Sequence, residues 1–302
     1  MANPDALPFY NYLGQIEYLP GYSESLGDWS PSTDESLSAE QQSVIDAVSH
    51  ILHKSPIESH VRAEDVNLTL EVGSEDRSKV IARKILLQNG ADLGHGVQKS
   101  KTEARLLQWL SNSTNIPVPR VLAPPDDQHG NVFIMDKLPG TMLLNIYGTF
   151  DTSAKERLVE QYAGFALNLF GLDVPRRIGT LIPATPSKSL DVIPMIGVNF
   201  HANEVFEDIR QYLAFLFAMK KSSPLIGADD GGHLSELRHH TEGLLAELLS
   251  NVTSSTLLRC VLVHRDLNDT NILVDQNGHI TGVIDWEYQV LHPVVLAADY
   301  PP

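Results

Sequence analysis

Hydrophobic residues recur first with a helical period and then with a strand period near the start of the chain. Ser38 and Gln41 stand at the spacing of a helix capping box. The apolar residues that follow on one helical face are Val44, Ile45, Val48, Ile51 and Leu52. Apolar positions then alternate over 66–72 and, after the turn residues 73–76, fill much of 80–85. The pattern predicts a helix that begins at Ser38 and a pair of strands after it.

The middle of the chain changes from short strands to helices. A helical pattern runs from Lys99 to Ser111, an apolar strand covers 132–135, and residues 136–140 form a link after it. Further helices are predicted at 153–170, 204–220 and 234–249. This order of elements predicts an α+β fold in three parts. The parts are an N-terminal arm over 1–37, a small β-rich lobe over 38–138 and a mostly helical lobe over 139–302.

The last part of the chain carries three short apolar runs. Val261–Val263 is typical of a buried strand, and 271–275 and 279–284 are typical of two more. Asn277-Gly278 lies between the latter two, and Asn-Gly is the strongest short signal for a hairpin turn. We therefore expect a β-hairpin that carries Asn271 where it begins and Asp285 where it ends.

Acidic and amide side chains stand at the ends of these three strands. His264-Arg265-Asp266 follows the first strand, Asn271 opens the hairpin and Asp285 closes it. Phosphoryl transfer from Mg·ATP needs oxygen groups of this kind, with a carboxylate beside the acceptor hydroxyl and two oxygen ligands on the metal. Asp266 is therefore the candidate catalytic residue, and Asn271 and Asp285 are the candidate metal ligands. The alternative, that these side chains merely form turns, explains Asn277 well and the others badly.

Charge and cysteine content limit the partners of the chain. Its 302 residues include 22 basic and 38 acidic ones, which gives a formal charge of −16. Such a chain is poorly suited to nucleic acid or an anionic membrane, because phosphate groups require clustered Lys and Arg. One cysteine, Cys260, excludes a disulfide or zinc framework. With no signal-peptide pattern and no apolar run long enough to span a membrane, the sequence predicts a cytoplasmic protein.

The segment VLVHRDLNDTNILVD, followed by GHITGVIDWE, resembles the catalytic segment of the aminoglycoside phosphotransferase and choline kinase-like enzymes. The order of the motifs is that of the family: a strand, His-Arg-Asp, Asn, an Asn-Gly hairpin and Ile-Asp-Trp. The resemblance implies a bilobal protein kinase-like fold. It also implies transfer of the γ-phosphoryl group of Mg·ATP to a hydroxyl of a small molecule. In this interpretation His264 braces the catalytic loop rather than reacting.

The resemblance extends to the nucleotide half of the site. The run 80–83 is similar to the strand that presents a basic residue to the ATP phosphates. Arg83 and Lys84 are strand neighbours, so they point to opposite faces and one of them can enter the cleft; family register favours Arg83. Glu103 is similar to the helix glutamate that pairs with this basic residue, although the helix dipole also favours an acid there. Met135 to Leu138 would be the hinge that offers backbone groups to adenine.

Two departures from the family pattern affect the expected phosphate binding and the expected large lobe. Residues 59–65 (SHVRAED) occupy the place of a glycine-containing hairpin whose backbone amides approach phosphates in the family, but they contain no glycine, so side chains should hinder that approach. The run from Ala297 to Pro301 resembles a landmark after which further helices normally line the acceptor pocket. Because the sequence ends at Pro302, we expect a large lobe that is truncated at its C-terminus.

Three functions are compatible with these observations. The first is a small-molecule phosphotransferase that uses Mg²⁺ and ATP. The second is a catalytically weak or inactive kinase-like protein that binds a nucleotide or a partner, which the two departures favour. The third, a protein kinase, is disfavoured because Trp286-Glu287 rather than Phe-Gly follows Asp285. The sequence leaves the acceptor, the activity and the oligomeric state open.

Overall fold

The computed structural model describes most of the chain between residues 38 and 297. The described residues are 8–10, 16–18, 38–64, 67–85, 93–129, 131–184, 189–196, 202, 204–222, 239–240, 242–244, 246–247, 250 and 259–297. Of the expected arm, two short antiparallel strands are described, β1 (Pro8–Tyr10) and β2 (Ile16–Tyr18). Within the predicted helix at 234–249, the described positions are helical, and the others lie outside the described residues.

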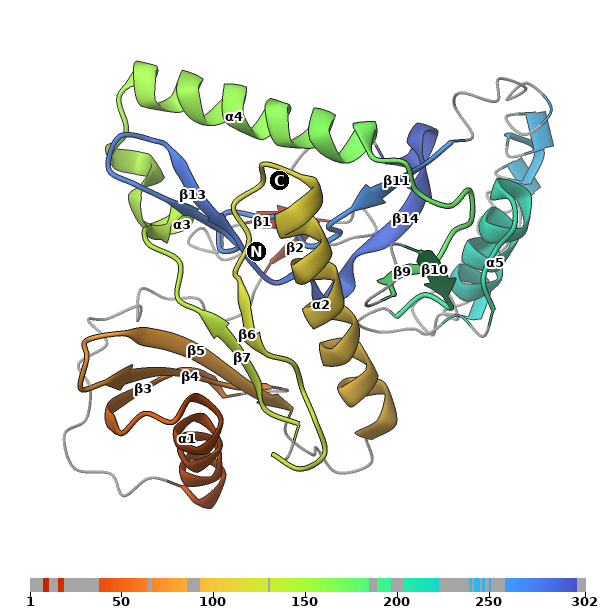
Figure 1. The fold of residues 1–302 in the computed structure, drawn as a ribbon. Helices are drawn as coiled ribbons and strands as arrows, with labels where there is room; N and C mark the ends of the chain where they lie inside the picture. Colours follow the sequence, from red (N-terminus) through yellow and green to blue (C-terminus); the bar gives the residue numbers. More distant parts are fainter. Residues whose placement is uncertain are drawn as a thin grey trace.

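A five-stranded antiparallel sheet forms the small lobe. Its strands in spatial order are β3 (Pro56–Glu64), β4 (Asn67–Ser74), β5 (Lys79–Ile85), β7 (Phe133–Asp136) and β6 (Val121–Ala123). The helix α1 (Ala39–Leu52) precedes the sheet and lies against it (Figure 1). Its predicted capping box is confirmed, because Ser38 Oγ accepts from the Gln41 N–H and Gln41 Oε1 accepts from the Ser38 N–H.

One face of this sheet is apolar and is covered by α1. The residues buried between helix and sheet include Val44, Val48, Leu68, Leu70, Val72, Ala82 and Ile134. They are the alternate positions of the strands and one stripe of the helix, as the two periods predict. Because side chains alternate along a strand, Arg83 of β5 lies on the other face of the sheet.

Residues 59–64 belong to the edge strand β3. Residues 56–64 pair with β4 in an antiparallel register that is irregular after Pro56 and after Val61. The two strands form a hairpin at the expected place, and their connection at 65–66 lies outside the described residues. The sequence pattern does not predict β3, because an edge strand is largely solvated and carries few alternating apolar residues.

The large lobe combines helices with three small sheets. The helix α2 (Leu93–Ser113) lies between the lobes and is followed by α3 (Leu143–Ile146), α4 (Thr152–Gly171) and α5 (Ile209–Ser222). The strands are β8 (Thr141–Met142), β9 (Thr180–Pro183), β10 (Leu190–Ile193), β11 (Cys260–Val263), β12 (Ile272–Val274), β13 (Ile280–Val283) and β14 (Val290–Pro293). Short 3₁₀ helices are η1 (Tyr147–Thr149), η3 (Trp286–Tyr288) and η4 (Val294–Leu296). The sheets are β13-β12-β8, β10-β9 and β11-β14.

The predicted helices at 99–111, 153–170 and 204–220 are present with shifted ends. The last of them begins at Ile209, because Asp208 Oδ1 accepts the N–H groups of Arg210 and Gln211 and so caps it. The strands β8, β9, β10 and β14 have two to four residues each, too few to produce a recognisable alternation. In the part of the chain that the structure describes, no helix is both long and apolar enough to cross a membrane.

The predicted hairpin is confirmed as β12 and β13, with Asn277-Gly278 in its turn. Gly278 has φ +78°, and a Cβ there would lie 2.5 Å from the carbonyl O of Ala154, so glycine is required. Gln161 of α4 donates to the Gly278 carbonyl O over 3.1 Å and accepts from the Ile280 N–H over 3.1 Å. Ala154 in the first turn of α4 and Gln161 in its third turn therefore hold the outer end of the hairpin, and Figure 1 shows β13 beneath α4.

Candidate active site

His264, directly after β11, joins the two loops that carry Asp266 and Asp285. Its ring is buried, and its Nε2–H donates to the carbonyl O of Ile284 over 2.9 Å. Its Nδ1 accepts the backbone N–H of Asp266 at 3.3 Å. These two partners select the neutral tautomer with its proton on Nε2. Burial lowers the pKa of His264 to about 4, so the ring stays uncharged at neutral pH and acts as a brace.

Two amide side chains hold the carboxylate of Asp266. Asn271 Nδ2 donates to Asp266 Oδ2 at 3.1 Å and to the Asp266 carbonyl O at 2.7 Å. Asn268 Nδ2 donates to the other carboxylate oxygen at 3.2 Å. Burial, followed by the negative charge of Asp285, raises the pKa of Asp266 above the ordinary aspartate value. A partly buried carboxylate with a raised pKa is what a general base for a hydroxyl group requires.

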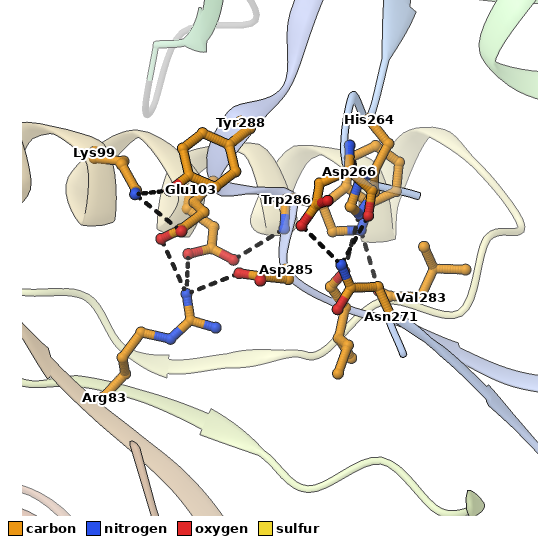
Figure 2. A network of polar contacts seen from close by, with 12 residues as sticks. Arg83, Lys99, Glu103, His264, Asp266, Asn271, Val283, Asp285, Trp286 and Tyr288 are labelled. Atoms are coloured by element: carbon orange, nitrogen blue, oxygen red, sulfur yellow. Dashed lines mark hydrogen bonds and ion pairs between the residues drawn. The ribbon is translucent and has the colours of Figure 1, made fainter. Parts of the chain in front are cut away.

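Asp285 is brought beside the same loop by the backbone. The Ile284 N–H donates to the Asn271 carbonyl O over 3.0 Å. Asp285 itself has φ 67° and ψ 53°, a left-handed conformation that is uncommon for a residue with a side chain. This conformation ends β13 and turns the chain into η3. Figure 2 shows Asp285 between Arg83 on one side and Asn271 on the other.

Three carboxylates surround Arg83. Its Nη1 lies 2.9 Å from Glu103 Oε2, 3.4 Å from Asp285 Oδ1 and 3.6 Å from Glu287 Oε2. Glu103 belongs to α2 and uses its second oxygen to accept the Trp286 N–H at 3.2 Å. Burial lowers the pKa of Arg83, but the carboxylates outweigh burial and raise it, so the guanidinium stays charged. Burial raises the pKa of Glu103 above the ordinary glutamate value, although the Arg83 charge opposes this shift.

Lys84 points away from this cluster. Its Nζ lies 2.7 Å from Glu40 Oε2 and 3.2 Å from Ser43 Oγ, both on α1. The alternation of side chains along β5 sends neighbouring residues to opposite faces, and tertiary packing decides which face meets α2. Arg83 is therefore the basic residue of this strand that reaches Glu103 and Asp285.

Sequence patterns alone do not single out Lys99 and Glu287, which complete the cluster. Lys99 Nζ lies 2.9 Å from Glu287 Oε1 and 2.9 Å from the hydroxyl O of Tyr288. A weak signal existed, because Lys99 stands one helical turn before Glu103 and so shares its face of α2. The partner of Lys99 could not be deduced, since Tyr288 is separated from it by 189 residues.

Met135 and Leu138 are the ends of the expected hinge, the first within the small-lobe sheet and the second in the link that follows β7. Met135 is a buried residue of β7. Leu138 packs on Gly282 of β13, where a Cβ would lie 2.8 Å from Leu138 Cδ1. Thr281 Oγ1 donates to the Pro139 carbonyl O over 2.6 Å. The link between the lobes is thus fastened to the same hairpin that carries the candidate metal ligands.

Asn271 and Asp285 are a donor set that suits Mg²⁺. The hydrogen bonds from Asn271 to Asp266 use the amide nitrogen, so they do not occupy the amide oxygen. Mg²⁺ binds hard oxygen ligands, and it usually takes one or two from the protein and the rest from water and phosphate. Among the described residues, no group of three or more His, Cys, Asp or Glu side chains is placed to hold a metal. The two side chains therefore fit a metal that is shared with a phosphate ligand.

A small antiparallel lobe, linked to a larger lobe that carries a His-Arg-Asp loop and the β12–β13 hairpin, defines the bilobal protein kinase-like fold. The expected α+β fold is confirmed by the solved structure of an aminoglycoside phosphotransferase. The gentamicin complex of APH(2″)-IIa superimposes with a TM-score of 0.53 at 14% identity, over 86% of this chain and 73% of that one. An amicoumacin kinase in complex with AMP-PNP has a TM-score of 0.49 at 15% identity, over 85% of this chain and 66% of that one.

The chain belongs to the phosphotransferase enzyme family, whose model, named APH, matches residues 66–296. The expected family is therefore confirmed. A relative from Ampulloclitocybe clavipes is 38% identical over 306 residues, which cover 98% of this chain and 75% of that protein. It is described as clavilactone A biosynthesis cluster protein Y.

Proposed function

We propose that this protein transfers the γ-phosphoryl group of ATP, bound with Mg²⁺, to a hydroxyl group of a small molecule. The observation that carries the proposal is the convergence of Asp266, Asn271 and Asp285 at one place, with Arg83 beside Asp285 (Figure 2). Membership of the phosphotransferase enzyme family supports the reaction class. The donor, the metal and the acceptor class are inferences from the chemistry of these side chains.

Asp266 is the residue proposed to meet the acceptor. Asn268 and Asn271 each donate one hydrogen bond to its carboxylate, which fixes the orientation of both oxygens. A fixed carboxylate can orient an acceptor hydroxyl in line with the phosphorus atom and accept its proton as the O–P bond forms. His264 takes no part in this proton transfer, because its two ring nitrogens are engaged with backbone groups.

Arg83 and the hairpin are proposed to hold the donor. Arg83 supplies a fixed positive charge for the phosphate groups, and Glu103 keeps its side chain extended toward them. Asn271 and Asp285 would hold Mg²⁺, which neutralises negative charge that develops on the phosphate oxygens when it is bound. Positioning and charge stabilisation of this kind account for most of the catalysis in phosphoryl transfer.

The inter-lobe link is proposed to hold the base of the nucleotide. Residues between Met135 and Leu138 would offer backbone N–H and C=O groups to adenine, with β5 above it. Residues 59–64 form the first strand of the β3–β4 hairpin and contain no glycine, so the phosphate groups are proposed to rely on Arg83 and the metal rather than on close approach to this backbone.

A small-molecule acceptor is favoured over a protein acceptor. The relative from Ampulloclitocybe clavipes is described as a biosynthesis cluster protein. Trp286-Glu287 follows Asp285 in this chain, whereas Phe-Gly follows this aspartate in protein kinases. Trp286 is fully buried and packs against the His264 ring.

The test is transfer of radiolabel from [γ-³²P]ATP to a panel of amino alcohols, amino sugars and phenols in the presence of Mg²⁺. Slow transfer to water provides a second readout that needs no acceptor. We expect Asp266→Asn to lower both rates about 100- to 10,000-fold, since general base catalysis contributes this much, and to leave Mg·ATP affinity within about threefold. Full turnover by Asp266→Asn would refute the assignment.

The second candidate function is a kinase-like protein that binds nucleotide without transferring phosphate. It is favoured by the engagement of Arg83 with three carboxylates, since these carboxylates compete with phosphate groups for the guanidinium. It predicts Mg·ATP binding to the wild type with no transfer to any acceptor or to water. A rate for the wild type no greater than that for Asp266→Asn would select this function.

A further inference from the structure

Arg83 faces an excess of negative charge. Glu103 at 2.9 Å and Asp285 at 3.4 Å are the partners expected of a basic residue beside a nucleotide. Glu287 is a third carboxylate, 3.6 Å from the same nitrogen atom. A guanidinium that is paired with three carboxylates binds phosphate less well, because contacts to these carboxylates must be broken first. For Arg83 to bind phosphate, another group of the cluster must compete with Arg83 for the Glu287 carboxylate.

Lys99 is placed to do this. Its Nζ is 2.9 Å from Glu287 Oε1, whereas Arg83 approaches the other oxygen, Oε2. Lys99 also donates to the Tyr288 hydroxyl at 2.9 Å and lies 4.1 Å from the centre of that ring. Lys99 and Glu287 are well shielded, with exposed fractions of 12% and 9% for their side chains. Contacts between charges are strong in such surroundings.

The helix α2 couples this contact to the rest of the site. Lys99 and Glu103 are one turn apart on the same face of α2, so one rigid element presents a cation to Glu287 and an anion to Arg83. Figure 2 shows Lys99 beside Tyr288 and the pair Glu103–Arg83 next to them. The four-residue spacing of Lys99 and Glu103 separates the ion pair Lys99–Glu287 from the ion pair Glu103–Arg83 along the helix axis.

We propose that Lys99 is a positioning residue for phosphoryl transfer. It holds Glu287 so that this carboxylate does not compete with the phosphate groups of the donor for Arg83. This inference rests on the proposed function. Loss of Lys99 leaves Glu287 as a buried carboxylate without its closest cation. Arg83 Nη1 already lies 3.6 Å from Glu287 Oε2, so the carboxylate would move the short distance to Arg83 and compete with ATP.

The test measures the affinity of the full-length chain for Mg·AMP-PNP by calorimetry in four forms. They are the wild type, Lys99→Met, Lys99→Arg and the double variant Lys99→Met with Glu287→Gln. We expect Lys99→Met to bind about 10- to 100-fold more weakly, because this change in affinity corresponds to the loss of one hydrogen bond to a charged group. Lys99→Arg should remain within about threefold of the wild type, because it keeps the charge next to Glu287. The double variant should recover most of the loss, because the competing carboxylate is gone.

A purely structural role predicts a different pattern. If Lys99 merely stabilises η3, removal of its partner Glu287 cannot restore affinity, and the double variant will bind no better than Lys99→Met. That result, or unchanged affinity in Lys99→Met, overturns the inference. If Lys99→Met does not fold, Glu287→Gln alone decides: affinity equal to or above that of the wild type supports the inference, and a tenfold loss overturns it. Failure of the folded wild type to bind Mg·AMP-PNP instead refutes the proposed function.

Discussion

Glu103 accepts the backbone N–H of Trp286 over 3.2 Å with one carboxylate oxygen, while its other oxygen lies 2.9 Å from Arg83. A single side chain of α2 therefore positions both the basic residue of the small lobe and the peptide group next to Asp285. Displacement of α2 would move these two parts of the nucleotide site together. The ordered position of α2 is thus a condition for binding the donor.

Glu103→Gln separates the two roles of this side chain. The amide oxygen can still accept the Trp286 N–H, but the charge opposite Arg83 is lost, and the guanidinium is drawn to Asp285 and Glu287. We expect Mg·ATP affinity to fall about tenfold with a small change in melting temperature. Calorimetry and thermal unfolding measure the two effects. Glu103→Ala, which loses both contacts, should be weaker and less stable, and equal affinity in Glu103→Gln and wild type would contradict this role.

Arg83 and Lys84 provide a matched pair of substitutions on one strand. Arg83→Gln should weaken Mg·ATP binding at least about tenfold, because a charge-assisted contact to phosphate is lost. It should also lower stability by about 3 kcal/mol or more, since Glu103 remains buried without its partner. Lys84→Gln should leave binding within about twofold, because Lys84 pairs with Glu40 on α1. Similar losses in the two variants would show that the nucleotide lies elsewhere.

The pH dependence of stability should contain a contribution from His264. Its pKa in the folded chain is about 4, below the ordinary 6.5. Between these values the unfolded chain binds a proton that the folded chain does not, so this contribution is complete above pH 6.5 and is lost as pH falls toward 4. His264→Gln, which does not titrate, should reduce the loss of stability between pH 7 and pH 5 by about 2 kcal/mol. Urea unfolding at the two pH values measures it, and an unchanged pH dependence would contradict the buried neutral ring.

Gly278 provides a test of the hairpin and its attachment to α4. Gly278→Ala should lower the free energy of unfolding by about 1–2 kcal/mol or more, because a Cβ meets the Ala154 carbonyl at 2.5 Å and φ is positive. Gly164→Ala is the control, since this position lies inside α4 and a Cβ there has no neighbour within 4 Å. It should raise stability by up to about 1 kcal/mol. Denaturant unfolding of both variants checks the signs, and a gain in stability for Gly278→Ala would show that the turn is wrongly placed.

Local signals in the sequence were enough to predict the hairpin. Asn277-Gly278 determines its turn, and flanking apolar residues determine its strands, so Asn271 and Asp285 follow at its two ends. The helix that begins at Ser38 is predicted in the same way from its capping box. These features depend on residues within one turn or one hairpin, where spacing alone carries the information.

Features that depend on distant contacts could not be predicted. The alternation along β5 shows only that Arg83 and Lys84 diverge; the family resemblance favoured Arg83, and the packing of α1 and α2 is the physical reason that Arg83 reaches Glu103. The contact of Lys99 with Tyr288 joins a helix of one lobe to a 3₁₀ segment that lies 189 positions away in the sequence. The roles assigned to Asp266, Asn271 and Asp285 stay predictions until their variants are measured.

The most direct test is calorimetric titration of the folded chain with AMP-PNP, with and without Mg²⁺, for the wild type and Asp285→Asn. The account predicts one binding site in the wild type, with affinity that drops at least about tenfold when Mg²⁺ is removed or when Asp285 loses its charge. The Asp285→Asn variant should also lose most of its response to Mg²⁺, because the carboxylate is a ligand of the metal. Binding that is equally tight in both proteins, or no binding to a well-folded wild type, would contradict the proposed nucleotide site.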